Sequence, residues 1–131
     1  MKSEDKKRQD SDLPMATSLW EWEYHHTGIP TKDKKPDEKY IPHLKMYVSG
    51  FSDSAYGIEW MRFDDDSPVH PLVQKVAHPA FVVQNLDKVI KNKKTLLPPT
   101  KPSDGVRVAM IEENGAPVEL IEFINKKSKN H

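Results

Sequence analysis

The sequence has no cysteine, no excess of charge of either sign and no long apolar run. Without cysteine the chain can have no disulfide and no thiolate ligand, so any metal must bind to histidine and carboxylate groups. The 20 Lys and Arg residues balance 20 Asp and Glu residues, which argues against a nucleic acid or an acidic membrane as partner. No stretch approaches the roughly 18 apolar residues of a membrane span, and the N-terminal residues are charged where a signal peptide is apolar. We therefore expect a cytoplasmic protein.

The hydrophobic fraction is also low, at 36% of 131 residues, against about 45–50% in typical globular domains. Part of the deficit lies in the charged ends, because neither can bury enough apolar surface to offset its ordering entropy. We expect residues 1–14 to be a disordered tail, residues 126–131 to be a basic tail, and residues 15–125 to form a single domain. A core completed by a second subunit would explain the rest of the deficit, so a homodimer is expected.

The first half of the domain, about residues 18–64, has the pattern of strands without a convincing helix. Trp20, Trp22, Tyr24 and His26 alternate with charged or polar residues, which predicts a strand with one aromatic face. The segments expected to follow are a polar connection at 31–39 and strands at 43–48 and 57–63.

The second half, about residues 76–124, has the pattern β-α-β-β-β. Asn85 is placed to cap a short helix, and Asn114-Gly115 is a strong hairpin signal. The expected strands are 76–83, an edge strand at 95–97 that Pro98 and Pro99 end, 106–112 and 117–123. Acidic residues and Ser67 before Pro68 predict that a linker helix at about residues 67–75 joins the halves. Each half has a His on its first strand and a Glu on its last, which indicates two related modules packed together.

The Asn114-Gly115 turn sets the register of the last hairpin. A two-residue loop pairs Arg107 with Glu122 and Met110 with Glu119. Glu122 then has a basic partner, whereas Glu119 shares its face with apolar side chains. A carboxylate among apolar groups costs several kcal/mol unless it is paired, protonated or bound to a metal. Glu119 therefore needs a cation, unless the face is exposed to solvent or the loop is longer.

Three other residues join Glu119 as candidates: His26, Glu59 and His78. A single histidine on a strand is more often a hydrogen-bonded core residue than a ligand. Together, two His and two Glu form a ligand set suited to Ni, Co, Zn, Mn or Fe(II), with room for water or substrate. His25 is expected at the surface or beside the site, and a slip in register would exchange it with His26.

These segments resemble the vicinal oxygen chelate superfamily, which includes glyoxalase I, methylmalonyl-CoA epimerase, extradiol dioxygenases, and the fosfomycin and bleomycin resistance proteins. In the first module the resemblance rests on His26-Thr27-Gly28-Ile29-Pro30 and Tyr56-Gly57-Ile58-Glu59-Trp60. In the second it rests on His78-Pro79-Ala80-Phe81-Val82-Val83, Asn85-Leu86-Asp87 and the last hairpin. It covers about residues 20–124 and is more specific in the second module.

The resemblance implies a fold and a metal site. The fold is α+β, with two paired βαβββ modules, the first helix-poor, that form a cupped mixed β-sheet of the glyoxalase type. His26, Glu59, His78 and Glu119 are implied as ligands of a divalent metal ion (Ni, Zn, Co, Mn or Fe), in the order found in bacterial glyoxalase I. Glu59 or Glu119 would then be the catalytic base.

The implied function is that of a metal-dependent enzyme acting on a small, vicinally oxygenated substrate. It would be a glyoxalase I-like lyase or isomerase that stabilises an enediolate or oxyanion. One alternative is an Fe(II) dioxygenase in which three of the residues hold the iron. Another is a non-catalytic small-molecule-binding protein of the resistance type.

Overall fold

A computed structural model describes residues 7–124 of the chain. The basic tail expected at residues 126–131 lies outside the described residues, as do residues 1–6 of the expected N-terminal tail. Residues 7–14 contain a turn, in which the amide of Gln9 donates to the Asp12 carboxylate at 2.9 Å. The short helix α1 (Met15–Ser18) follows this turn.

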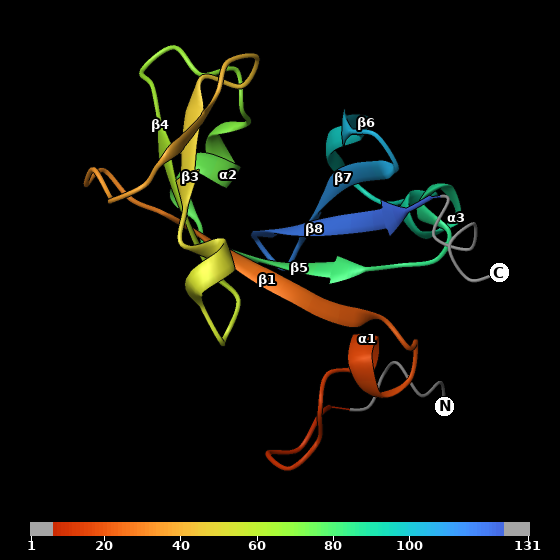
Figure 1. Cartoon of the computed structure of the whole chain (residues 1–131). Coiled ribbons are helices and arrows are strands. Elements are labelled where there is room, and N and C mark those ends of the chain that lie inside the picture. Colours follow the sequence, from red (N-terminus) through yellow and green to blue (C-terminus); the bar gives the residue numbers. More distant parts are fainter. Residues whose placement is uncertain (1–6, 125–131) are drawn as a thin grey trace, which may run out of the picture.

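Eight strands form one mixed sheet (Figure 1), in the order β2-β3-β4-β1-β5-β8-β7-β6. Their bounds are β1 (Glu23–Pro30), β2 (Lys39–Ile41), β3 (Met46–Ser49), β4 (Ile58–Phe63), β5 (His78–Val82), β6 (Thr95–Ser103), β7 (Val106–Glu113) and β8 (Ala116–Phe123). β1 is parallel to β4, β5 is parallel to β8, and β1 and β5 meet antiparallel at the centre. The strand order therefore repeats on either side of this seam, which confirms the expected α+β fold of two modules.

Short-range signals place the helix and the last hairpin of the second module correctly. The Asn85 side chain accepts from the amide of Lys88 at 3.1 Å and begins α3 (Leu86–Ile90). Asn114 and Gly115 have φ of 53° and 81°, as a two-residue hairpin turn requires. The helix covers a core cluster on one face of the sheet, formed by Val83, Leu86, Ala109, Ile111 and Leu120. Leu120 follows Glu119 in β8, so Glu119 lies on the opposite face.

The last strand before the hairpin is longer than the sequence predicts. β6 does not stop at Pro98 and Pro99 but continues to Ser103. It is the edge strand of the sheet and its register with β7 shifts at several points. An edge strand tolerates proline because one side of its backbone needs no partner.

The first module has no helix between β1 and β2, as the sequence predicts. The polar connection at residues 31–38 takes its place. The guanidinium of Arg62 on β4 donates to the Glu38 carboxylate at 2.7 and 2.8 Å, and it lies 4.0 Å from the ring centre of Tyr47. The ammonium group of Lys35 lies 4.1 Å from the ring centre of Trp60. Contacts between charged and aromatic side chains therefore cover the face of the first module on which Trp60 and Arg62 lie.

The linker helix begins later than expected. α2 spans Pro71–Lys75, and its cap is His70, whose Nδ1 accepts from the amide of Leu72 at 3.0 Å. Ser67 instead donates to the carbonyl of Leu44 at 2.6 Å, and Asp66 pairs with Lys45 at 2.5 Å. These tertiary contacts occupy the side chains that the sequence pattern assigns to the cap.

The first strand also departs from its pattern. It begins at Glu23, so Trp20 and Trp22 precede it. Tyr24 pairs with Phe81, but His26 pairs with Ala80, because the register shifts between Tyr24 and His26. Phe81 and Ala80 are neighbours on β5 and point to opposite faces. The bulge therefore places His26 on the face opposite to Tyr24, and the expectation of a shared aromatic face is wrong.

None of the helices in residues 7–124 has the length and apolar character needed to cross a membrane.

Candidate metal centre

The seam between the modules brings the four candidate residues together in two rows. One row runs from His26 on β1 through Ala80 on β5 to Glu119 on β8. The other runs from His78 on β5 through Gly28 on β1 to Glu59 on β4. Residues in register on neighbouring strands share a face, and so do residues two apart on one strand. All four candidates therefore lie on the same face of the sheet.

The side chains of these residues converge. Nε2 of His26 lies 3.2 Å from Oε1 of Glu59 and 3.5 Å from Oε1 of Glu119. Nε2 of His78 lies 3.1 Å from Oε1 of Glu119. The ligand atoms of His26, His78 and Glu119 all lie within 4.8 Å of one another. Glu59 adjoins this group through His26.

Two small residues, Gly28 and Ala80, make room for this convergence. A Cβ atom at Gly28 would lie 2.6 Å from Cε1 of His78 and 3.1 Å from Sδ of Met61. Ala80 holds the equivalent place beside His26 and is 0% exposed. The residue pattern of the sequence does not reveal their role, although each lies two residues after a candidate histidine. A small residue two positions after each candidate histidine is the sequence signal that points to this role.

The histidines control the charge of Glu119. Burial acts to raise the pKa of Glu119, but hydrogen bonds from His26 and His78 outweigh it and lower the pKa to about 2. Burial acts to lower the pKa of His26, and the interactions with Glu119 and Glu59 outweigh it, so the pKa is raised. Glu119 is therefore held as a carboxylate among buried groups.

Glu59 has a different environment. Burial raises its pKa, the charge of Glu119 adds to this effect, and His26 and His78 oppose it. Its side chain is 20% exposed, against 15% for Glu119. The two carboxylates therefore differ in how readily they take up a proton.

The donor set fits a divalent transition metal. Two imidazole nitrogens and carboxylate oxygens approach one point, which suits Ni, Co, Zn, Mn or Fe(II). His26 and His78 are 6% and 1% exposed, so their rings are fixed by their surroundings. Nδ1 of His78 is buried without a hydrogen-bond partner among residues 7–124. Its Nε2 is therefore the nitrogen that takes part in the site.

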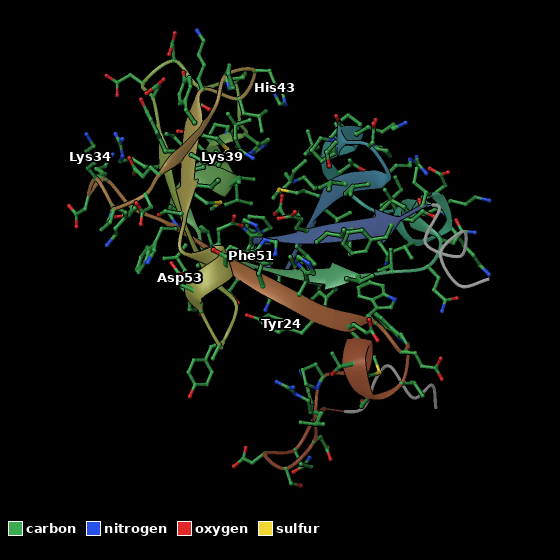
Figure 2. All side chains as sticks on the ribbon, in the orientation of Figure 1. Tyr24, Lys34, Lys39, His43, Phe51 and Asp53 are labelled. Atoms are coloured by element: carbon green, nitrogen blue, oxygen red, sulfur yellow. The ribbon has the colours of Figure 1, made fainter. Side chains whose placement is uncertain are left out.

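Aromatic side chains border the centre. Phe51, from the 3-10 helix η2 (Phe51–Asp53), lies where the two halves of the molecule meet (Figure 2). Its ring stacks on His25 with a centroid distance of 5.2 Å and meets His26 edge-on at 5.6 Å. An open cavity of about 450 Å³ lies beside them, lined by Tyr24, His25, Phe51, Ser54, Ala55, Tyr56 and Gly57. His25 thus lies between this cavity and the centre, in keeping with a place beside the site.

Comparisons with known proteins agree on the fold. No protein-family model matches the sequence, and no curated protein matches it significantly. A hypothetical protein from Bacillus halodurans C-125 has a similar structure, with a TM-score of 0.60 and 15% identity over 80% of this chain and 96% of that one. Methylmalonyl-CoA epimerase from Mycobacterium tuberculosis has a TM-score of 0.55 and 17% identity, over 82% of this chain and 91% of that one. At these identities the likeness shows the fold alone, and the chain has a glyoxalase-like α+β fold with a curled mixed sheet.

Proposed function

We propose that the protein is a divalent-metal-dependent enzyme whose centre consists of His26, Glu59, His78 and Glu119. It acts on a small substrate with two neighbouring oxygens, as a lyase or isomerase of the glyoxalase I kind. One observation carries the proposal: the ligand atoms of two nearly buried histidines and Glu119 lie within 4.8 Å of one another at the seam of both modules.

The residues of the centre have two roles: some would bind the metal ion, and one would transfer a proton. A bound divalent cation would supply a Lewis acid for two adjacent substrate oxygens. His26, His78 and Glu119 are placed to hold it, because both histidines contact the Glu119 carboxylate. Glu59 contacts one histidine and is more exposed. It is therefore better placed to take a proton from a carbon acid and to return it.

The name of one structural neighbour is in keeping with this class of reaction. That neighbour is named an epimerase, and removal and return of a proton at one carbon is a common route to epimerisation. The same step, with return of the proton at a neighbouring atom, is an isomerisation. A single base such as Glu59 can serve the isomerisation, whereas an epimerisation also needs the proton to return to the opposite face of the carbon.

Metal content is the first test. Protein purified without chelators or an affinity tag should contain near-stoichiometric Ni, Zn, Co, Mn or Fe by mass spectrometry. Glu119→Gln should weaken metal binding by about 10–100-fold or more, because it removes a ligand that both histidines contact. Glu122→Gln is the matched control, since Glu122 lies on the same strand but pairs with Arg107 at 3.1 Å on the other face. Absence of metal even after reconstitution would overturn the proposal and favour a non-catalytic binding protein.

Proton transfer is the second test. The metal-loaded protein, incubated in D₂O with small α-hydroxy ketones and hemithioacetals, should incorporate deuterium at the carbon next to the carbonyl, as read by NMR. Glu59→Gln should keep the metal and slow this exchange by about 10²–10⁴-fold. Exchange at an unchanged rate in Glu59→Gln would remove Glu59 from the role of base.

A specific observation keeps the dioxygenase as a second candidate. The tight group formed by His26, His78 and Glu119 has the two-histidine, one-carboxylate composition of non-haem Fe(II) oxygenases. Iron as the bound metal, together with oxygen consumption in the presence of a vicinal diol, would favour this candidate. Any other metal with deuterium exchange would favour the isomerase.

A further inference from the structure

We propose that His25 is a positioning residue for the metal centre: Nδ1 of His25 accepts a hydrogen bond from Nδ1 of His26 and so directs Nε2 of His26 toward the carboxylates. The inference rests on the proposed metal site and adds a residue to it. The two Nδ1 atoms lie 2.8 Å apart, within hydrogen-bond distance.

The bulge in β1 creates this contact. Neighbouring residues of a regular strand point to opposite faces, so consecutive histidines would be separated by the sheet. Here the register passes from the pair Tyr24–Phe81 directly to the pair His26–Ala80, which leaves His25 as the additional residue. A bulge redirects a side chain, and the rings of His25 and His26 meet with a centroid distance of 5.0 Å and an interplanar angle of 72°.

The two nitrogens of His26 must have different roles. Nε2 faces Glu59 and Glu119. When Nε2 gives its electron pair to a cation, the ring proton of a neutral imidazole resides on Nδ1. The 2.8 Å contact then makes Nδ1 of His25 the acceptor, and the proton of His25 resides on its Nε2. A hydrogen bond of this kind fixes the tautomer and orientation of a ligand histidine.

Aromatic packing holds the acceptor in place. The ring of His25 stacks on Phe51 at 22° between planes, and its centroid lies 5.9 Å from that of Phe123. An acceptor that is already oriented loses little conformational freedom when the hydrogen bond forms. Phe51 and Phe123 therefore contribute to the orientation of His26 through His25.

The second module has no equivalent of His25. The position before His78 is Ala77, which cannot accept a side-chain hydrogen bond. Nδ1 of His78 has no hydrogen-bond partner in the described part of the chain. The ring of His78 instead packs against Gly28, where a Cβ atom would lie 2.6 Å from its Cε1. The two metal-facing histidines are therefore oriented in different ways, one by a hydrogen bond and one by packing.

Two variants separate the hydrogen bond from the packing. His25→Phe keeps a ring against Phe51 but cannot accept a hydrogen bond, whereas His25→Asn places Oδ1 near the position of Nδ1. Zn²⁺ affinity is measured by competition with a chromophoric chelator. We expect His25→Phe to weaken binding by about 10–100-fold and His25→Asn to stay within about threefold of the wild type.

A second readout uses the wild-type protein and does not depend on the folding of any variant. Long-range ¹H–¹⁵N NMR of the Zn²⁺-loaded protein should show the proton of His26 on Nδ1 and that of His25 on Nε2. Equal Zn²⁺ affinity of His25→Phe and wild type, an equal loss in His25→Phe and His25→Asn, or a His25 proton on Nδ1 would overturn the role of His25 and leave the metal site standing. A wild-type protein that binds neither Zn²⁺ nor Co²⁺ would overturn both proposals.

Discussion

The absence of a side chain at Gly28 decides where His78 can lie. The imidazole of His78 occupies the volume that a Cβ at Gly28 would fill, with Cε1 at 2.6 Å from that position. Gly28 does not have a positive φ, so its backbone would accept alanine. The requirement for glycine is therefore one of space at the metal centre.

Gly28→Ala tests this requirement. His78 is 1% exposed, so its ring cannot move away without disturbing its neighbours. Overpacking of a buried site costs about 1–3 kcal/mol, and we expect a loss of this size in the free energy of unfolding measured with urea. The ring should also leave its place near Glu119, which weakens metal binding.

A double-mutant cycle provides the control. If the steric contact with His78 causes the loss, Gly28→Ala should cost much less in a His78→Ala background, where the ring is absent. Additive effects of the two substitutions would show that the contact is not the cause.

At the scale of single residues, the sequence predicts the surroundings of Glu119 but not the face of the sheet on which His26 lies. Glu119 follows from the hairpin register, since Met110–Glu119 and Arg107–Glu122 pair as the turn requires. The resemblance implies His26 as a ligand, whereas the alternation of residues 20–26 predicts that it shares a face with Tyr24, which the bulge prevents. A bulge arises where strands from different parts of the chain pair, so local alternation does not reveal it.

Among the elements, the connection at residues 31–38 replaces the helix that its module lacks. Its Glu38 side chain is 6% exposed and accepts both hydrogen bonds from Arg62. Hydrogen bonding to Arg62 lowers the pKa of Glu38 to about 2. The folded protein therefore keeps Glu38 ionised at pH values where the unfolded chain protonates it.

This difference predicts a pH dependence of stability. Because the folded-state pKa is lowered from 4.5 to about 2, the contribution of Glu38 is present above pH 4.5 and is lost as the pH falls toward 2. Urea unfolding of the wild type between pH 7 and pH 2 should show this loss, and Glu38→Gln should show a smaller one. Glu23→Gln, at an exposed position of β1, should match the wild type. Equal pH profiles of Glu38→Gln and wild type would contradict the role of the ion pair.

The sequence predicts elements that depend on neighbouring residues better than elements that depend on contacts between distant parts of the chain. The Asn85 cap and the Asn114-Gly115 turn depend on residues a few positions apart, and both are confirmed. The start of α2 depends on Ser67 and Asp66 binding to Leu44 and Lys45, which lie more than 20 positions earlier in the chain. The length of β6 depends on its place at the sheet edge. Neither these tertiary contacts nor the edge position of β6 can be read from the sequence pattern.

At the scale of the whole molecule, the two modules meet at the proposed metal centre. Each module supplies one histidine and one glutamate to it. A metal ion bound there would connect the modules and would bind the folded state in preference to the unfolded one. At about 100 times the Kd this preference stabilises the fold by about 2.7 kcal/mol. We expect Zn²⁺ or Co²⁺ to raise the Tm in scanning calorimetry and a chelator to reverse the rise.

The control for this prediction is His78→Ala, which should show little or no rise in Tm with the same metal. A rise of the same size in wild type and His78→Ala would place the stabilising ion elsewhere on the protein. The homodimer expected from the composition stays a prediction, which sedimentation velocity would check.

By itself the sequence determined what depends on neighbours in the chain: the strand-rich pattern, the helix cap at Asn85, the turn at Asn114-Gly115 and the apolar surroundings of Glu119. Only the tertiary structure decided which face His26 occupies and that His25 contacts His26. It also decided that the small residues Gly28 and Ala80 leave space for the rings of His78 and His26. The physical reason is that strand pairing in a mixed sheet joins residues far apart in the chain. Their register is set by packing across the whole sheet.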